Sequence, residues 1–186
     1  IGIGGSGMSV VAELLASRGA TVEGSDREDS AVLEHLRSVG VRVFVGHEAS
    51  HVDPDSVVVV STAIREDNPE LAIARTRGQL VIHRSQALAL AATGMRFVGV
   101  AGAHGKTSTS GMLAIALAAC GLDPSVAVGG VLPQLGTGAH LGGGDVFVAE
   151  ADESDGSFLN YSPAIEIVTN VEPDHLDRYH SREEFE

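Results

Sequence analysis

Short apolar segments alternate with amphipathic segments along the first half of the chain. Apolar strands are expected at 1–3, 20–24, 41–45, 56–60 and 80–82, with helices between them at 7–18, 30–39, 68–78 and 85–92. The strand at 56–60 is almost entirely valine, which is typical of a parallel sheet covered on both faces. Strands alternating with helices predict an α/β fold in which a Rossmann-like, doubly wound parallel sheet comes first.

A second α/β unit is expected to begin near Thr93-Gly94. Its elements are predicted as a strand at 96–99, a helix at 106–120, and further strands at 145–149 and 165–169. The glycine-rich segment 129–144 is interpreted as a set of turns. The pattern therefore predicts two domains, 1–93 and 94–186, the second being part of a P-loop-type ATPase domain. Because the chain starts inside a strand and stops as a helix begins, we interpret it as a fragment of a longer protein.

Composition narrows the class of partner. The 186 residues carry a net charge of −13. This charge argues against nucleic acid as a partner, because the sequence has no basic patch that could neutralise a phosphate backbone. No apolar run approaches the roughly 18–20 residues needed to cross a bilayer. The single cysteine, Cys120, cannot form an internal disulfide, and we expect it to be buried. This cysteine usage fits a reducing, cytoplasmic compartment.

A glycine turn at 102–108, G-A-H-G-K-T-S, follows the apolar strand and opens the helix at 106. Backbone N–H groups in such a turn, together with the helix dipole, bind phosphate oxygens. Lys106 supplies a charge for the β- and γ-phosphates, and Thr107 supplies a hydroxyl for Mg²⁺. The general P-loop spacing would need glycine at Val100, so this turn is a shorter form of that motif. We predict nucleotide phosphate binding here.

A second glycine turn, G-I-G-G-S-G at 2–7, lies between the first strand end and the first helix. Asp26 follows about 20 residues later, after the next strand, as in the Rossmann-type fingerprint. The pattern predicts a diphosphate at the helix N-terminus and a ribose near Asp26. It leaves open whether the ligand is NAD, FAD or a UDP-sugar.

Acidic clusters follow the last two predicted strands. Glu150 is the first acid of E-A-D-E-S-D at 150–155, and His175 lies within N-V-E-P-D-H-L-D at 170–177. Ligands of α/β sheets bind at the carboxyl ends of strands, so a carboxylate there can face Thr107 and hold Mg²⁺. We therefore predict Glu150 as a metal ligand. His175 is a candidate contact for a metal or a phosphate.

Six motifs in this order resemble the Mur ligase family of ATP-dependent amide-forming enzymes. They are G-I-G-G-S-G-M-S at 2–9, E-G-S-D at 23–26, S-T-A-I at 61–64 with D-N-P-E at 67–70, the turn at 102–108, E-A-D-E-S-D-G-S-F at 150–158 and V-T-N-V-E-P-D-H-L-D at 168–177. The resemblance spans essentially the whole chain. One departure is Ala103, where the family usually has threonine; it matters little if that position contributes mainly its backbone N–H.

The resemblance implies that L-alanine is joined to the lactyl carboxylate of UDP-N-acetylmuramate, through an acyl phosphate, in peptidoglycan synthesis. The implied cofactors are ATP and Mg²⁺, and a third domain beyond residue 186 would bring the amino acid. Catalytic roles are implied for Lys106, Glu150 and His175, and metal ligation for Thr107, Glu150 and His175. ATP would contact Gly102, Ala103, His104, Gly105, Lys106, Thr107 and Ser108. The UDP-sugar would contact Gly4, Gly5, Ser6, Gly7, Asp26, Ser61, Thr62, Ala63, Asp152, Glu153 and Ser154.

Three alternatives remain open at this point. A sister ligase attaches a preformed peptide to the same UDP-sugar, and the residues that choose the amine would lie in the third domain. A UDP-sugar-binding module without catalysis is the second alternative. An NAD(P)-dependent oxidoreductase built on the turn at 2–7 is the third, and it leaves the turn at 102–108 and both acidic clusters unexplained. The oligomeric state is not indicated by the sequence.

Overall fold

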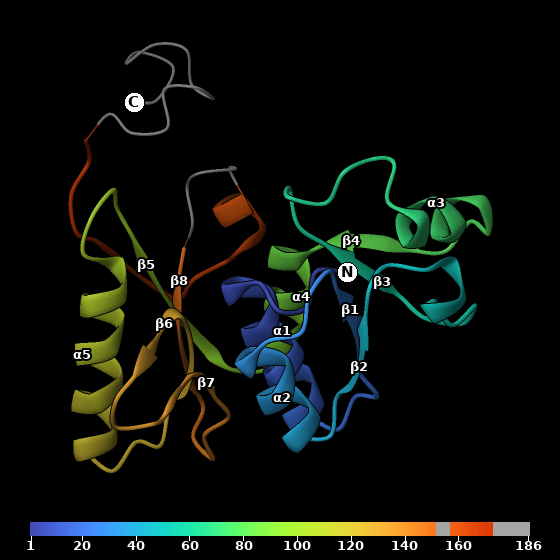
Figure 1. Ribbon diagram of the computed structural model, residues 1–186. Helices are drawn as coiled ribbons and strands as arrows, with labels where there is room; N and C mark the ends of the chain where they lie inside the picture. Colours follow the sequence, from blue (N-terminus) through green and yellow to red (C-terminus); the bar gives the residue numbers. More distant parts are fainter. Residues whose placement is uncertain (152–156, 173–186) are drawn as a thin grey trace. The chain divides into compact units, whose positions relative to one another are not determined.

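A computed structural model describes residues 1–151 and 157–172. The chain divides into two compact units, Ile1–Ala91 and Ala92–Glu186 (Figure 1). Each unit is an α/β structure with parallel strand pairing, which confirms the predicted fold class. Within the described ranges, no helix is long and apolar enough to cross a membrane.

The first unit contains two pairs of parallel strands surrounded by helices. Its elements are α1 (Ser6–Ser17), β1 (Glu23–Asp26), α2 (Ala31–Ser38), β2 (Arg42–Val45), η1 (Ala49–His51), β3 (Val58–Val60), α3 (Pro69–Thr76), β4 (Val81–His83) and α4 (Arg84–Ala91). Strand β1 pairs with β2, and β3 pairs with β4. Every helix predicted between the strands is present, so the alternating pattern was sufficient to identify them.

The first residues connect the two strand pairs, although they form no strand of their own. The N–H groups of Gly2 and Ile3 both donate to Ser25 O in β1, at 2.8 and 2.9 Å. The nitrogen of Ile1 donates to Val59 O in β3 at 2.9 Å. Residues 1–3 were predicted as a strand end, and they do run between β1 and β3 as a central strand would.

Local signals set the helix boundaries in this unit. The side chain of Ser30 accepts a hydrogen bond from Leu33 N and caps α2. Asn68 accepts from Glu70 N and Leu71 N and caps α3, with Pro69 in the first turn. Such caps satisfy backbone donors that the helix leaves without partners. The predicted starts at Ser30 and Asn68 are therefore confirmed by side-chain capping.

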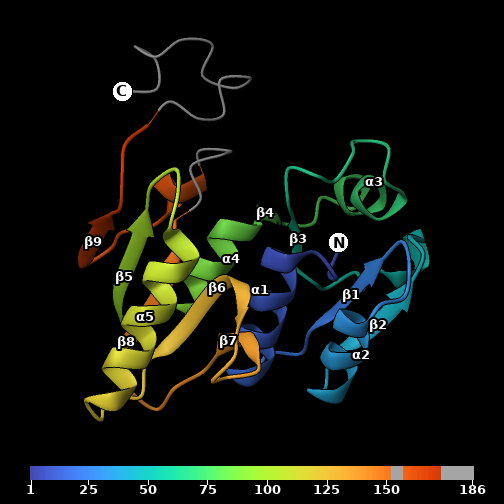
Figure 2. The same cartoon turned by 60° about the vertical axis from the view of Figure 1, so that its left-hand side comes forward.

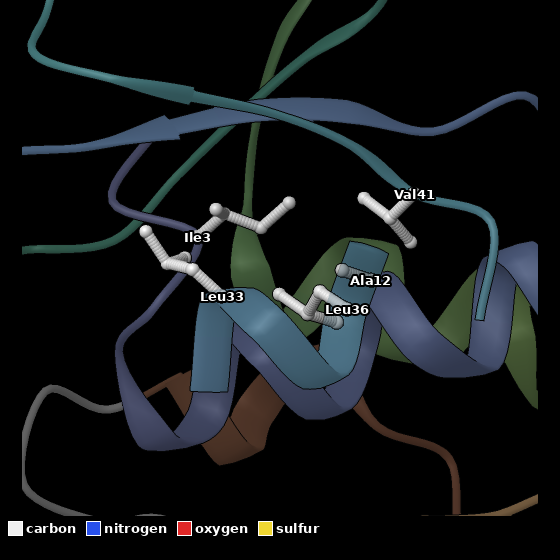
Figure 3. Close-up of a cluster of buried hydrophobic side chains, with 5 residues drawn as sticks. All are labelled: Ile3, Ala12, Leu33, Leu36 and Val41. Atoms are coloured by element: carbon white, nitrogen blue, oxygen red, sulfur yellow. The ribbon is translucent and has the colours of Figure 1, made fainter. Parts of the chain in front are cut away.

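Apolar side chains of α1, of α2 and of the segments next to these helices form a compact cluster (Figure 3). It consists of Ile3, Ala12, Leu33, Leu36 and Val41, all at most 5% exposed. Figure 3 shows the side chains of Leu33 and Leu36 directed from α2 toward Ile3 and Val41. Burial of this cluster fixes α2 against the β1–β2 pair and keeps the turn at 2–7 beside the end of β1.

The second unit is a five-stranded sheet with one long helix packed on it (Figure 2). Its elements are β5 (Arg96–Ala101), α5 (Lys106–Ala119), β6 (Ser125–Leu132), β7 (Thr137–His140), β8 (Val146–Glu150), η2 (Ser157–Asn160) and β9 (Ile165–Val168). The strand order is β7-β6-β8-β5-β9, and only the β6–β7 pair is antiparallel. Helix α5 packs across β5, β6 and β8.

Two predictions for this unit were wrong. The glycine-rich segment 129–144 was interpreted as turns, but half of it belongs to the antiparallel pair of β6 and β7. Glycine permits close approach here, since a Cβ at Gly138 would lie 2.5 Å from Val128 O. Cys120, predicted to be buried, is exposed. It occupies the C-cap of α5, beyond the part of the helix that packs on the sheet.

Candidate nucleotide-binding sites

The turn between β5 and α5 has the backbone geometry of an anion site. Gly105 is the N-cap of α5 with φ +85°, and no side chain caps this helix end. The first N–H groups of a helix have no partner inside it, so those of Thr107 and Ser108 are available to a ligand. The positive end of the helix dipole adds to their attraction for phosphate.

Residues after β9 hold this turn from one side. Asn170 Nδ2 donates to His104 O at 2.9 Å, and His104 N donates to Asn170 Oδ1 at 3.2 Å. The Thr169 hydroxyl lies 2.7 Å from His104 O and 3.1 Å from Ala101 O, so these two carbonyl groups share its single proton. These bonds connect the turn at 102–108 to the carboxyl end of the neighbouring strand.

Gly102 is the point at which the turn and the β9 end touch. Its φ is +127°, and a Cβ there would lie 2.2 Å from Thr169 Oγ1 and 2.9 Å from Asn170 O. No other residue type fits this contact without moving backbone. The Lys106 ammonium donates to Gly102 O at 2.7 Å, which folds the lysine side chain back over the turn.

Glu150, Thr107 and two glycines of β6 lie together at the carboxyl end of the sheet. Glu150 Oε1 accepts from Gly129 N at 3.2 Å. A Cβ on Gly130 would lie 3.1 Å from Thr107 Cγ2, and one on Gly129 would lie 3.4 Å from Glu150 Oε2. The absence of side chains at these two glycines thus lets Thr107 and Glu150 each lie close to the β6 backbone.

This pair of oxygen ligands suits Mg²⁺, which takes one or two protein ligands and completes its shell with phosphate and water. In the described part of the chain, no three His, Cys, Asp or Glu residues gather as a metal cluster. His175, Asp152, Glu153 and Ser154, which were predicted as site residues, lie outside the described residues. Their roles remain predictions.

In the first unit, the glycine turn is tied to Asp26. Gly4 N donates to Asp26 Oδ2 at 2.8 Å, and Arg27 N donates to Asp26 Oδ1 at 2.7 Å. Both carboxylate oxygens therefore hold backbone, so Asp26 fixes the turn against the end of β1. Each oxygen has a second lone pair, so a ribose hydroxyl still finds an acceptor there.

A cleft with a volume of about 680 Å³ opens at the N-terminus of α1. It is lined by Gly2, Gly5, Ser6, Gly7, Met8, Asp26, Arg27, His47, Ser61, Ala63, Ile64, Arg65, Asp67, Asn68, Pro69 and Arg84. Most residues predicted for the UDP-sugar line it, whereas Gly4 and Thr62 do not. The N-cap of α1 is Gly5, and no side chain caps it. The cleft therefore combines helix N–H donors with three arginines, which suits a diphosphate.

Sequence reasoning missed several cleft residues, notably Arg84 and His47. Arg84 directly follows β4, and His47 follows β2 by two residues. The rule that ligands bind beyond the carboxyl ends of parallel strands would have identified both. Arg84 lies against the glycine turn, since a Cβ on Gly7 would lie 1.9 Å from its Nη1. Gly7 thus leaves the space beside α1 that this arginine side chain occupies.

Comparison with known proteins places this chain in a family. The family model described as "Mur ligase family, catalytic domain" matches residues 1–96, and "Mur ligase middle domain" matches residues 100–186. The chain belongs to the Mur ligase family.

Curated relatives make the relationship more specific. A protein of Renibacterium salmoninarum named UDP-N-acetylmuramate–L-alanine ligase is 56% identical over 98% of this chain and 39% of its own length. A Streptomyces griseus protein of the same name is 56% identical over 99% of this chain and 40% of its own. The chain thus spans about two fifths of the length of the curated relatives it matches.

Solved structures include both kinds of ligase considered above. UDP-N-acetylmuramate-alanine ligase from Thermotoga maritima has a TM-score of 0.88 and 34% identity, over 99% of this chain and 44% of that one. UDP-N-acetylmuramate:L-alanyl-gamma-D-glutamyl-meso-diaminopimelate ligase from Neisseria meningitides has a TM-score of 0.90 and 28% identity. That match covers 99% of this chain and 63% of the other.

Proposed function

We propose that the protein containing this chain is an ATP-dependent ligase that joins L-alanine to the lactyl carboxylate of UDP-N-acetylmuramate. The observation that carries the proposal is a pair of uncapped helix N-termini, each preceded by a glycine turn, in a chain 56% identical to named alanine ligases. Two such turns suit a reaction with two nucleotide substrates.

ATP is assigned to the turn at 102–108. The N–H groups at the start of α5 and the Lys106 ammonium would neutralise the β- and γ-phosphates, and charge neutralisation is the main need in phosphoryl transfer. Lys106 already donates to Gly102 O, so its amine is held beside the turn before ATP binds. Thr107 and Glu150 would hold Mg²⁺ there, and His175 remains a predicted further ligand.

UDP-N-acetylmuramate is assigned to the cleft of the first unit. The start of α1 and the cleft arginines would bind its diphosphate, while Asp26 and the residues after β2 lie where a nucleoside would fit. In the reaction, the lactyl carboxylate attacks the γ-phosphorus, giving ADP and an acyl phosphate. The amine of L-alanine then attacks the acyl carbon and expels phosphate.

The tripeptide ligase is the second candidate, because the Neisseria structure has a TM-score of 0.90 to this chain. The curated alanine ligases at 52–56% identity favour the first candidate. The two differ in the amine substrate, so the amine decides between them.

The test is phosphate release by the full-length protein with ATP, Mg²⁺ and UDP-N-acetylmuramate. Release that depends on L-alanine is expected, and Lys106→Ala should lower it by orders of magnitude because a charge at the transferred phosphoryl group is lost. Release only with L-alanyl-γ-D-glutamyl-meso-diaminopimelate would identify the second candidate. No release with either amine would leave a UDP-sugar-binding module.

The assignment of Mg²⁺ to Glu150 has its own test. Glu150→Gln keeps the carbonyl oxygen that accepts from Gly129 N but removes the charge that attracts the cation. We expect the variant to need about tenfold more Mg²⁺ for half-maximal phosphate release, the effect of roughly 1.4 kcal/mol. An unchanged Mg²⁺ titration would remove Glu150 from the metal site.

A further inference from the structure

A buried carboxylate next to the cleft is not used by the mechanism above. Glu70, in the first turn of α3, is 1% exposed. Its Oε2 lies 2.5 Å from Ser25 Oγ and 3.2 Å from His47 Nδ1, and its Oε1 lies 3.2 Å from His51 Nδ1. A buried charge costs folding free energy unless such donors surround it.

The hydrogen bonds decide which nitrogen of His47 carries a proton. The Ser25 hydroxyl has a single proton, and its short contact directs that proton to the Glu70 carboxylate. Ser25 Oγ also lies 2.9 Å from His47 Nδ1, so it must accept there. His47 therefore donates from Nδ1, and the Nε2 of its neutral form is an acceptor.

That acceptor belongs to a residue of the cleft wall. His47 lines the cleft and its side chain is 22% exposed, while His51 does not line it. No described residue forms a hydrogen bond with His47 Nε2. Gly46 N donates to Asp26 O at 2.7 Å, which holds the His47 segment beside the carboxyl end of β1. His47 is thus held in the cleft wall next to Asp26, the residue proposed to lie near the nucleoside.

We propose that His47 is a specificity-determining residue whose Nε2 accepts a hydrogen bond from an N–H or O–H of the bound uridine, and that Glu70 is the positioning residue that fixes its tautomer. The inference rests on the proposed assignment of the UDP-sugar to this cleft. A carboxylate fixes the tautomer of an imidazole in the same way at metal sites, where the histidine ligand donates its other ring N–H to a carboxylate.

The test uses UDP itself, titrated calorimetrically into the full-length protein. His47→Asn keeps an N–H near the position of Nδ1 for Glu70 but removes Nε2, and we expect about tenfold weaker UDP binding. His51→Asn is the matched control because it alters the other imidazole on Glu70, and its affinity should stay within about twofold. ATP binding, which is assigned to the other unit, should be unchanged in both variants.

Analogues of UDP that each lack one hydrogen-bond donor identify the group that donates to His47 Nε2. N3-methyl-UDP removes the base N–H, whereas 2′-deoxy-UDP and 3′-deoxy-UDP each remove one ribose hydroxyl. One of them should bind the wild type about tenfold more weakly than UDP does but bind His47→Asn no more weakly than UDP does.

Glu70→Gln should weaken UDP binding when His47 is present. In the His47→Asn variant, the same Glu70→Gln change should leave the UDP affinity unaltered. Equal UDP affinity in wild type and His47→Asn would overturn the inference alone. Absence of UDP binding to the wild type would overturn the proposed assignment of the cleft as well.

Discussion

At the scale of single residues, the two glycines of the turn at 102–108 have different reasons for being glycine. Both have positive φ, +127° at Gly102 and +85° at Gly105. Only Gly102 is crowded, by Thr169 and Asn170, whereas a Cβ on Gly105 would meet no atom within 4 Å. The sequence motif identified both as turn residues. The contact with the β9 end depends on a partner more than 60 residues away, so the motif could not reveal it.

This difference predicts unequal costs of substitution by alanine. Gly105→Ala should destabilise the protein by about 1–2 kcal/mol, the cost of a left-handed backbone for an L-residue. Gly102→Ala should cost about 3 kcal/mol, because the clash with Asn170 backbone adds an overpacking penalty. Urea unfolding of the two variants measures the difference. Equal destabilisation would show that the Thr169–Asn170 contact does not constrain Gly102.

At the scale of elements, the carboxyl ends of the strands carry the candidate chemistry, and the opposite ends carry stability. Arg96 at the start of β5 forms a two-bond ion pair with Asp145, just before β8, at 3.0 and 2.9 Å. Both side chains are exposed, so the pair contributes modestly. The hydrogen bond with the Arg96 side chain lowers the pKa of Asp145. The ion pair holds the parallel strands β5 and β8 in register at the end of the sheet opposite the turn at 102–108.

The lowered pKa predicts how this contribution depends on pH. A carboxyl whose pKa is depressed by folding stabilises the protein above its unfolded pKa of about 3.9, and the effect is lost as pH falls through the folded pKa. Asp145→Asn should therefore lower Tm at pH 7, and its difference from wild type should shrink toward zero below about pH 4. Glu166→Gln, which removes an exposed charge from β9, is the control. A difference that persists in acid would exclude the ion pair as its cause.

At the scale of the whole molecule, two units each place a glycine turn and an uncapped helix N-terminus at the carboxyl ends of parallel strands. The same arrangement in both units explains why two nucleotide substrates are proposed for one protein. The chain covers 39% of the length of the Renibacterium relative. The phosphate-release experiment is accordingly a test of the full-length protein.

The sequence by itself determined most of the succession of strands and helices along the chain, the two glycine turns and the family, because these depend on local periodicity, glycine spacing and motif order. One error came in the β6–β7 pair, where a high glycine content did not distinguish strands from turns. The other came at Cys120, whose exposure was decided by packing. Only the tertiary structure brought Glu70, Ser25 and His47 together and placed Arg84 against Gly7. These contacts join residues 22 to 77 positions apart, and chain topology, rather than any local pattern, makes them neighbours.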